Sequence, residues 1–245
     1  MTNEQASFLV GTSGWTYDHW KGRFYPAGLA KSRWFDYYVS LFPAVEINAT
    51  FYGFFKDQTY VNWRERARPG FKFVLKAPKL ITHRKYLLDV EEDICKFWNS
   101  VSLLGDKLGL VLLQIAPDMP YDPARLRRAI QTFSNPQKVA VEFRKGDWFN
   151  DDIRALLQET GAVFCDAESP RFQLTGWVTS SSGYMRLHGR QHWYAYNYSE
   201  EELKGIASKA HQMEAGGAER VYIFFNNDYE AYAPANALTL IEMLK

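Results

Sequence analysis

Eight short runs of apolar and β-branched residues recur along the chain and predict eight β-strands. They begin at intervals of about 30 residues, which is typical of strands separated by helices rather than by tight turns. Leu110–Leu113 and Val221–Phe225 are apolar without interruption, the pattern of parallel strands that are buried on both faces. The predicted strands are Phe8–Gly14, Ala44–Ala49, Lys72–Ala77, Gly109–Ala116, Lys138–Phe143, Ala162–Asp166, Tyr184–His188 and Arg220–Asn226.

Most intervals between these runs carry the apolar periodicity of amphipathic helices. Asp89 and Glu92 have the spacing of a capping box ahead of one such helix, and Asp122 followed by Pro123 marks the start of another. The interval Ser169–Ser182 is polar and has no helical period. We therefore expect an irregular or missing outer helix after the sixth strand.

Eight strands with mostly helical connections predict an α/β fold, namely a closed (β/α)₈ TIM-like barrel formed by residues 1–245 as a single domain. An open, doubly wound sheet is the competing architecture. The first strand is followed by Gly11-Thr12-Ser13-Gly14, which is neither the G-x-G-x-x-G motif of dinucleotide-binding folds nor a P-loop. The sequence therefore favours the barrel.

Polar residues gather at the carboxyl ends of the predicted strands, which is where barrel enzymes build their active sites. Residues two apart share a face of a strand, so pairs such as Glu142 and Arg144 should converge on the barrel mouth. The candidate catalytic residues are Glu46, Glu142, Asp166 and His188. The candidate substrate-binding residues are Trp15, Asn48, Tyr52, Lys76, His83, Gln114, Arg144, Arg186, Asn226 and Asn227.

These residue types suit two kinds of chemistry. Carboxylates and a histidine can act as general acids and bases, while lysine and arginine can hold a phosphate or carboxylate. A desolvated Lys76 can also form a Schiff base, but no neighbouring motif favours this, so we expect anion binding or an ion pair with Glu46. The alternative for the whole cluster is a structural ion-pair network, for instance Glu46 with Arg186 and Glu142 with Arg144.

Seven stretches carry a resemblance to a known family. They are Gly11–Trp15, Glu46–Tyr52, Lys76–Pro78 with Ile81–His83, Leu113–Gln114, Val141–Arg144, Arg186–Gly189, and Phe225–Asp228 with Asn236–Ala237. In this order, covering nearly the whole chain, they resemble the DUF72 (YecE-like) family. The resemblance implies a TIM-barrel-like fold with a pocket at the strand ends, and it implies no particular reaction.

Composition narrows the classes of protein. With 29 Lys and Arg against 28 Asp and Glu, the formal charge is +1, unlike the strong positive excess of proteins that bind long duplex nucleic acid. The 2 cysteines exclude a disulfide scaffold. The apolar runs are shorter than a membrane span, and Met1–Ser7 lacks a signal-peptide core, so we expect a cytoplasmic protein without a membrane partner.

Three functions remain open. The first is an enzyme that uses Glu and His for acid–base chemistry and Lys and Arg to bind a small phosphorylated or sugar-like substrate. The second is a metal-dependent hydrolase, isomerase or nuclease. No specific ligand spacing appears in the sequence, so we expect no cofactor, with a bound divalent metal as the alternative. The third is a non-catalytic protein that binds a nucleotide, a sugar or short single-stranded RNA through aromatic residues after the strands. The oligomeric state is not encoded in any of these patterns.

Overall fold

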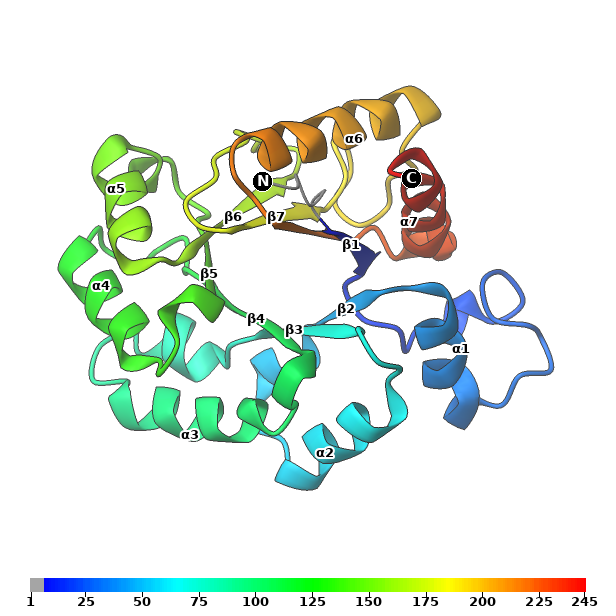
Figure 1. The fold of residues 1–245 in the computed structure, drawn as a ribbon, viewed down its shortest axis with the longest axis horizontal. Coiled ribbons are helices and arrows are strands. Elements are labelled where there is room, and N and C mark those ends of the chain that lie inside the picture. The colour runs from blue at the N-terminus through cyan, green and yellow to red at the C-terminus, as the bar shows by residue number, and fades with distance from the viewer. Residues whose placement is uncertain (1–6) are drawn as a thin grey trace, which may run out of the picture.

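A computed structural model describes residues 7–245 and contains a ring of eight parallel strands with helices outside it (Figure 1). The strands are β1 (Ser7–Thr12), β2 (Ala44–Ile47), β3 (Lys72–Lys76), β4 (Leu108–Gln114), β5 (Val139–Glu142), β6 (Val163–Glu168), β7 (Ser182–Leu187) and β8 (Arg220–Phe225). The helices are α1 (Trp34–Leu41), α2 (Asp57–Arg66), α3 (Glu91–Ser102), α4 (Pro123–Thr132), α5 (Asp151–Thr160), α6 (Glu200–Ala215) and α7 (Tyr232–Met243). The predicted TIM-like barrel is therefore confirmed.

The ring is nearly closed, with its seam between β1 and β2. Hydrogen bonding runs in the order β1-β8-β7-β6-β5-β4-β3-β2, and across the seam only an isolated parallel bridge joins Ser13 to Glu46 among residues 7–245. The Tyr38 hydroxyl fills the gap, because it accepts from the backbone N–H of Thr12 at 2.8 Å and donates to the carbonyl of Ala44 at 3.1 Å. A helix side chain thus replaces strand-to-strand bonds that β1 and β2 do not make.

Gly11 permits this close approach of the two strands. A Cβ atom at this position would lie 2.1 Å from the carbonyl oxygen of Ala44 and 3.0 Å from the Tyr38 hydroxyl. Only a residue without a side chain fits there.

The interior of the barrel is a compact apolar cluster, separate from the larger core between strands and helices. Its members alternate along the strands with residues that face the helices, as the two-residue period of a strand requires. They are Leu9, Ala44, Val74, Leu110, Leu112, Ala140, Val163, Cys165, Tyr184, Tyr222 and Phe224. This cluster fills the lower barrel, so the polar residues lie above it at the carboxyl ends of the strands.

The connection from β6 to β7 contains no helix, as the aperiodic sequence predicts. The Asp166 carboxylate organises the connection by accepting the backbone N–H groups of Thr175 at 3.0 Å and Gly176 at 2.7 Å. Asp166 therefore points outward and Cys165 points into the barrel. The expectation that Asp166 faces the mouth is wrong, because the strand places its side chain on the opposite face.

Helix starts follow the predictions at one position and depart from them at another. Asp122 accepts the backbone N–H of Arg125 and caps α4, with Pro123 as the first helical residue. Asp89 does not cap α3; the helix begins at Glu91, and Asp89 itself lies in the left-handed region at φ 49°. The spacing of a capping box is present, but the preceding turn holds Asp89 outside the cap.

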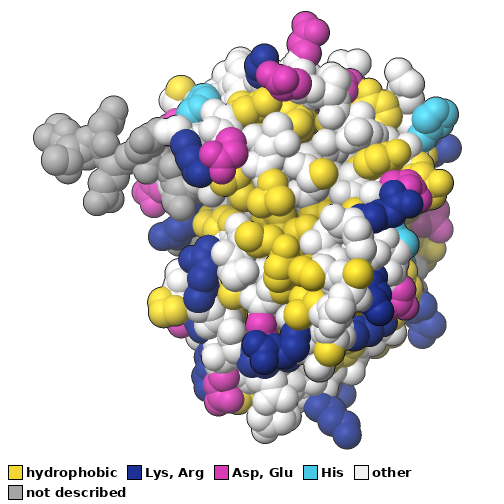
Figure 2. Space-filling view, turned by 90° about the vertical axis from the view of Figure 1, so that its right-hand side faces the viewer, with side chains coloured by type: hydrophobic (Ala, Val, Ile, Leu, Met, Phe, Trp, Pro, Cys, Tyr) yellow, Lys and Arg dark blue, Asp and Glu magenta, His cyan; other side chains and the backbone are white. Residues whose placement is uncertain are grey.

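One outer face carries an apolar groove between α1 and α7. Figure 2 shows hydrophobic side chains gathered on this side of the molecule, with Lys and Arg around them. The groove has a volume of about 360 Å³, and Phe24, Tyr37, Leu41, Pro234 and Leu238 supply its apolar lining. It lies on the outside of the barrel and shares no lining residue with the pocket at the barrel mouth.

Candidate functional site

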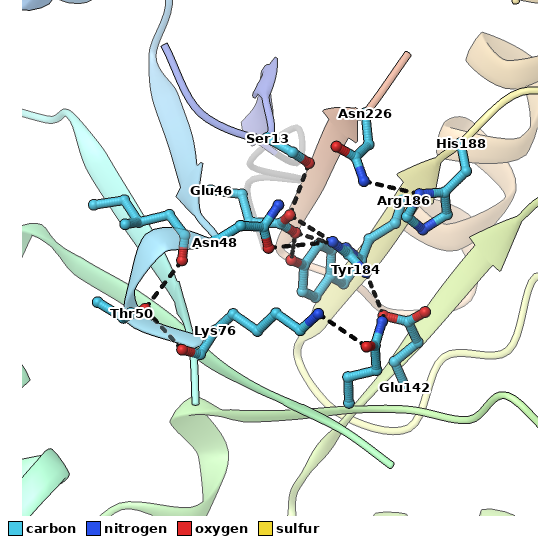
Figure 3. Close-up of polar contacts among 12 residues, drawn as sticks. Ser13, Glu46, Asn48, Thr50, Lys76, Glu142, Tyr184, Arg186, His188 and Asn226 are labelled. Atoms are coloured by element: carbon cyan, nitrogen blue, oxygen red, sulfur yellow. Dashed lines mark hydrogen bonds and ion pairs between the residues drawn. The ribbon is translucent and has the colours of Figure 1, made fainter. Parts of the chain in front are cut away.

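Glu46 and Arg186 form the centre of the polar cluster (Figure 3). Glu46 lies on β2 and is fully buried, while Arg186 comes from β7 and is 1% exposed. Arg186 donates from Nε to Glu46 Oε2 at 2.8 Å and from Nη2 to Oε1 at 2.7 Å, so the pair is bidentate. Ser13 Oγ donates to Oε1 at 2.7 Å, and the Tyr184 hydroxyl donates to Oε2. Four donors therefore saturate the carboxylate.

Glu142 is the second buried carboxylate and links Arg186 to the rest of the site. Arg186 Nη1 donates to Glu142 Oε2 at 2.5 Å, and Arg144 forms an ion pair with Oε1. Gln114 Nε2 donates to Oε2 at 3.1 Å. The two glutamates and two arginines thus form one continuous network in which each buried charge has an opposite charge beside it.

This network keeps both glutamates ionised. Burial alone would raise the pKa of Glu46, but the guanidinium of Arg186 and the hydroxyls of Tyr184 and Ser13 lower it below its usual value. Burial would likewise raise the pKa of Glu142, but Arg144 and Arg186 hold it well below that range. Such carboxylates are poor proton donors at neutral pH and weak bases. Both ion pairs that the sequence suggested are therefore present: Glu46 with Arg186 and Glu142 with Arg144.

His188 lies at the end of β7, next to the network. Arg144 Nη2 donates to His188 Nε2 at 2.9 Å, and since a guanidinium only donates, the ring proton must be on Nδ1. Nδ1 lies 2.9 Å from the side-chain nitrogen of Asn226, and because a protonated Nδ1 donates, the Asn226 amide must turn its oxygen toward the ring. Burial, and then the charges of Arg186 and Arg144, lower the pKa of His188 well below its usual value. The ring is therefore neutral, and it supports Arg144.

Lys76 is the exception to the charge pairing. Its Nζ donates to Gln114 Oε1 at 2.8 Å and lies 4.0 Å from the centre of the Phe51 ring. It forms no ion pair with a carboxylate among residues 7–245, so the expected pair with Glu46 is not present. Burial, followed by the charge of Arg186, lowers the pKa of Lys76 to about 8. The pKa of this half-buried amine is therefore closer to neutral pH than that of an ordinary lysine.

These groups face a pocket of about 610 Å³ at the mouth of the barrel. Eight of the predicted site residues line it, namely Asn48, Tyr52, Lys76, Gln114, Arg144, Arg186, His188 and Asn226. Aromatic side chains supply most of the rim: Tyr17, Phe51, Phe172, Trp193 and Tyr194. Tyr52 is 74% exposed and Tyr194 is 45% exposed, so both offer ring faces to a ligand.

The remaining predicted residues lie outside the lining of this pocket. Trp15 packs on Phe35 and Trp63, with ring centres 5.0 and 5.9 Å away, and so belongs to the apolar shell. Asn227 faces away and donates to the backbone carbonyl of Tyr196 at 2.7 Å, which orders the loop after β8. The placement of Asn227 follows from alternation along the chain, because Asn226 takes the inward position.

His83 lies close to the pocket without lining it. Its ring meets Phe51 edge-on at 5.0 Å, and its Nδ1 is 2.8 Å from Thr82 Oγ1. Burial and then the charge of Lys76 lower the pKa of His83. His83 therefore buttresses the ring on which Lys76 rests.

Arg171 and Phe172 line the pocket and are not among the predicted site residues. They come from the irregular β6–β7 connection, where Phe172 stacks on Phe149 with ring centres 5.5 Å apart. The sequence does hold a signal for them: an aperiodic segment in place of a helix, on the side of the barrel where sites are built.

Four residues are of types that bind divalent metals, but they do not form one ligand set: Glu46, Glu142, Asp166 and His188. Asp166 points outward, and the oxygens of Glu46 and Glu142 are occupied by arginines. Nowhere in residues 7–245 do three or more His, Cys, Asp or Glu side chains come together as a metal-binding group. In the same part of the chain, no helix is long and apolar enough to cross a membrane.

Fold and site together define a parallel eight-stranded α/β barrel with a polar, cationic pocket at its mouth. The profile of the family described as "Protein of unknown function DUF72" matches residues 9–245, so the chain belongs to the DUF72 family. It is 23% identical to the UPF0759 protein YunF of Bacillus subtilis, with 96% of this chain and 94% of YunF covered. It is 26% identical to the UPF0759 protein YecE of Escherichia coli K12 over 46% of this chain and 42% of YecE.

Solved structures agree with the family assignment. A DUF72 family protein from Thermotoga maritima superposes with a TM-score of 0.87 at 29% identity, covering 97% of this chain and 99% of that one. A DUF72 family protein from Enterococcus faecalis, at 21% identity, has a TM-score of 0.83 over 97% of this chain and 95% of that one, which shows the shared fold.

Proposed function

We propose that the barrel mouth is an enzyme active site for a small anionic substrate such as a phosphorylated sugar. One observation carries the proposal: four cationic side chains line the pocket, whereas Asp228 is its one lining carboxylate among residues 7–245. The cations are Lys76, Arg144, Arg171 and Arg186. The buried glutamates beneath them compensate two of these charges, so a net positive charge still faces the ligand.

Arg144 is the group best placed to bind the anion. Its Nε faces Glu142 and its Nη2 donates to His188, while Nη1 makes no hydrogen bond within residues 7–245. The side chain is 14% exposed, so Nη1 can reach a ligand in the pocket. A guanidinium held in place on two sides is preorganised for a phosphate or carboxylate, which lowers the entropic cost of binding.

The amides and aromatic rings suit the rest of such a ligand. Asn48, Gln114 and Asn226 line the pocket and can exchange hydrogen bonds with hydroxyl groups. Tyr52 and Tyr194 offer exposed ring faces that favour a sugar or a base. A nucleotide is therefore the second ligand class, and a short single strand would bind through the same rim.

Calorimetric titration with glucose, glucose 6-phosphate, ribose 5-phosphate and AMP tests the proposal. We expect the phosphorylated probes to bind more tightly than glucose, and their binding to weaken as salt is added. Arg144→Lys keeps the positive charge beside Glu142 but loses the planar guanidinium that can donate two parallel hydrogen bonds to a phosphate. It should weaken phosphate binding at least about tenfold, since hydrogen bonds to charged groups contribute about 1.5–3 kcal/mol.

Lys204→Met is the matched control, because Lys204 is an exposed lysine of α6 paired with Glu200, far from the pocket lining. It should leave every affinity unchanged. Equal affinity for glucose and glucose 6-phosphate, or unchanged phosphate binding in Arg144→Lys, would reject the anion site. Stronger binding of AMP than of ribose 5-phosphate would favour the nucleotide class.

A further inference from the structure

We propose that Lys76 is a nucleophile that forms an imine with the carbonyl group of its substrate. The substrate class is then an aldehyde or ketone that also carries a phosphate or carboxylate. This inference rests on the proposed function, because the anionic group is what Arg144 would hold while the carbonyl reaches Lys76.

The surroundings of Lys76 distinguish it from Arg144 and Arg186. Arg144 and Arg186 each contact a carboxylate, but the neutral amide of Gln114 lies between Glu142 and Lys76. Glu142 can only accept, so Gln114 must turn its NH₂ toward Glu142 and its oxygen toward Lys76. The network therefore gives Lys76 a neutral hydrogen-bond acceptor where a carboxylate would have kept it protonated.

The other contact of Lys76 is a cation–π contact. Its Nζ lies 4.0 Å from the centre of the Phe51 ring, and that ring also packs against His83 with ring centres 5.0 Å apart. Phe51, Gln114 and Lys76 all line the pocket, so the two contacts hold the amine at its wall. A substrate carbonyl in the cavity can reach it without any rearrangement of the buried ion pairs.

Burial and the charge of Arg186 give this geometry its reactivity. With a pKa lowered to about 8, a much larger share of the Lys76 side chains is free amine near neutral pH than of an ordinary lysine. Desolvated lysines with a cationic neighbour are the usual route to an activated amine nucleophile.

The step is balanced without any further reactant. The amine nitrogen attacks the carbonyl carbon and forms the C–N bond, the C–O bond breaks, and the oxygen leaves as water with the two hydrogens of the amine. No oxidant or reductant is needed. An imine withdraws electrons from the adjacent carbon, so this site would suit isomerisation or bond cleavage next to a carbonyl.

Reductive trapping tests the inference. The intact protein is incubated with dihydroxyacetone phosphate, glyceraldehyde 3-phosphate or pyruvate, reduced with sodium borohydride, and mapped by peptide mass spectrometry. We expect the adduct of at least one probe to accumulate at Lys76 in preference to exposed lysines such as Lys145 and Lys204. Adducts distributed over exposed lysines, with none enriched at Lys76 for any probe, would overturn the inference.

Lys76→Arg separates the two proposals, because it keeps a positive charge in the pocket but cannot form an imine. We expect it to lose the trapped adduct while Arg144 still binds glucose 6-phosphate. Loss of the adduct with retained phosphate binding supports the imine. If Arg144→Lys abolishes phosphate binding while no adduct forms at Lys76, the anion site stands and the imine fails.

A probe-independent measurement guards against a poor choice of carbonyl compound. The rate of acetylation by trace acetic anhydride, followed for each lysine as a function of pH, reports the ionisation of its amine. Lys76 should reach half of its maximal reactivity near pH 8, and Lys204 well above this, since the Glu200 carboxylate raises its pKa. A midpoint for Lys76 above pH 10 would contradict the inference directly.

Discussion

The substitution Glu46→Gln tests whether the buried ion-pair network holds the barrel together. It changes the shape of the side chain little and removes its charge. In the structure Glu46 is fully buried and accepts hydrogen bonds from Ser13, Tyr184 and two nitrogens of Arg186. A glutamine amide replaces one acceptor oxygen with an NH₂ group, which leaves two of these four donors without an acceptor.

The expected loss of stability follows from these contacts. Arg186 would keep Glu142 and lose one of its two counter-ions while staying 1% exposed. Breaking a buried ion pair by removing one partner costs about 3–5 kcal/mol, because an uncompensated charge stays behind. For a chain of this size, that loss lowers the melting temperature by roughly 6–20 °C.

Urea unfolding followed by tryptophan fluorescence and far-ultraviolet circular dichroism measures the effect. Glu159→Gln is the matched control, because Glu159 pairs with Arg127 at 2.7 Å on the surface, where the two side chains are 61% and 39% exposed. Surface pairs contribute about 0–1 kcal/mol, so the control should unfold nearly as the original protein does.

A result within about 1 kcal/mol of the control would refute the reasoning, since it would mean that Glu46 is not ionised or that the donors find other acceptors. Should Glu46→Gln fail to fold, Tyr184→Phe provides a milder test. It removes one donor to the carboxylate and should cost about 1.5–3 kcal/mol, the usual value of a hydrogen bond to a charged group.

Three further outcomes follow from the structure. The pKa of His188 is lower in the folded chain than its usual value, so the unfolded chain takes up the proton first as pH falls below about 6.5. The free energy of unfolding should therefore decrease from about pH 6.5 to 5, and it should decrease less steeply in His188→Gln. Asp166→Ala should speed hydrogen exchange at the backbone amides of Thr175 and Gly176, which donate to Asp166, by an amount equivalent to about 1–3 kcal/mol. Asp166→Asn keeps an acceptor oxygen and should speed this exchange less. Gly11→Ala should lower the melting temperature by the equivalent of about 1–3 kcal/mol or more, because its Cβ would meet a β2 carbonyl, whereas an unchanged melting temperature would mean that the seam can open without cost.

The fold could be predicted from the sequence because its signals are local. A parallel strand that is buried on both faces must be apolar throughout, as Val221–Phe225 is, and a helix that packs on it must repeat its apolar positions. The absence of a helix after β6 could be predicted for the same reason, since Ser169–Ser182 has no apolar period to bury. Each of these features is set by residues near in sequence.

Part of the site was predictable for a related reason. Arg186 and His188 lie two apart at the end of a strand, so they must share a face, and the barrel brings them to Arg144 and Asn226. Position at a strand end is therefore enough to identify eight residues of the pocket lining. It does not determine which of them pair with each other, because the partners come from different strands.

Only the tertiary structure decided the facing of β6 and the charge state of the site. Cys165 and Asp166 are neighbours on β6, and the two-residue period allows either of them to face the inside of the barrel. The choice depends on which side chain hydrogen-bonds to the β6–β7 connection. In the same way, Lys76 has a lowered pKa because the folded barrel buries it and brings the charge of Arg186 near it, while Gln114 lies between it and Glu142. The sequence by itself determined the strands, the helices and the polar mouth, since those depend on local periodicity. The burial, distance and pairing that set the chemistry exist only once β3, β4 and β5 lie side by side.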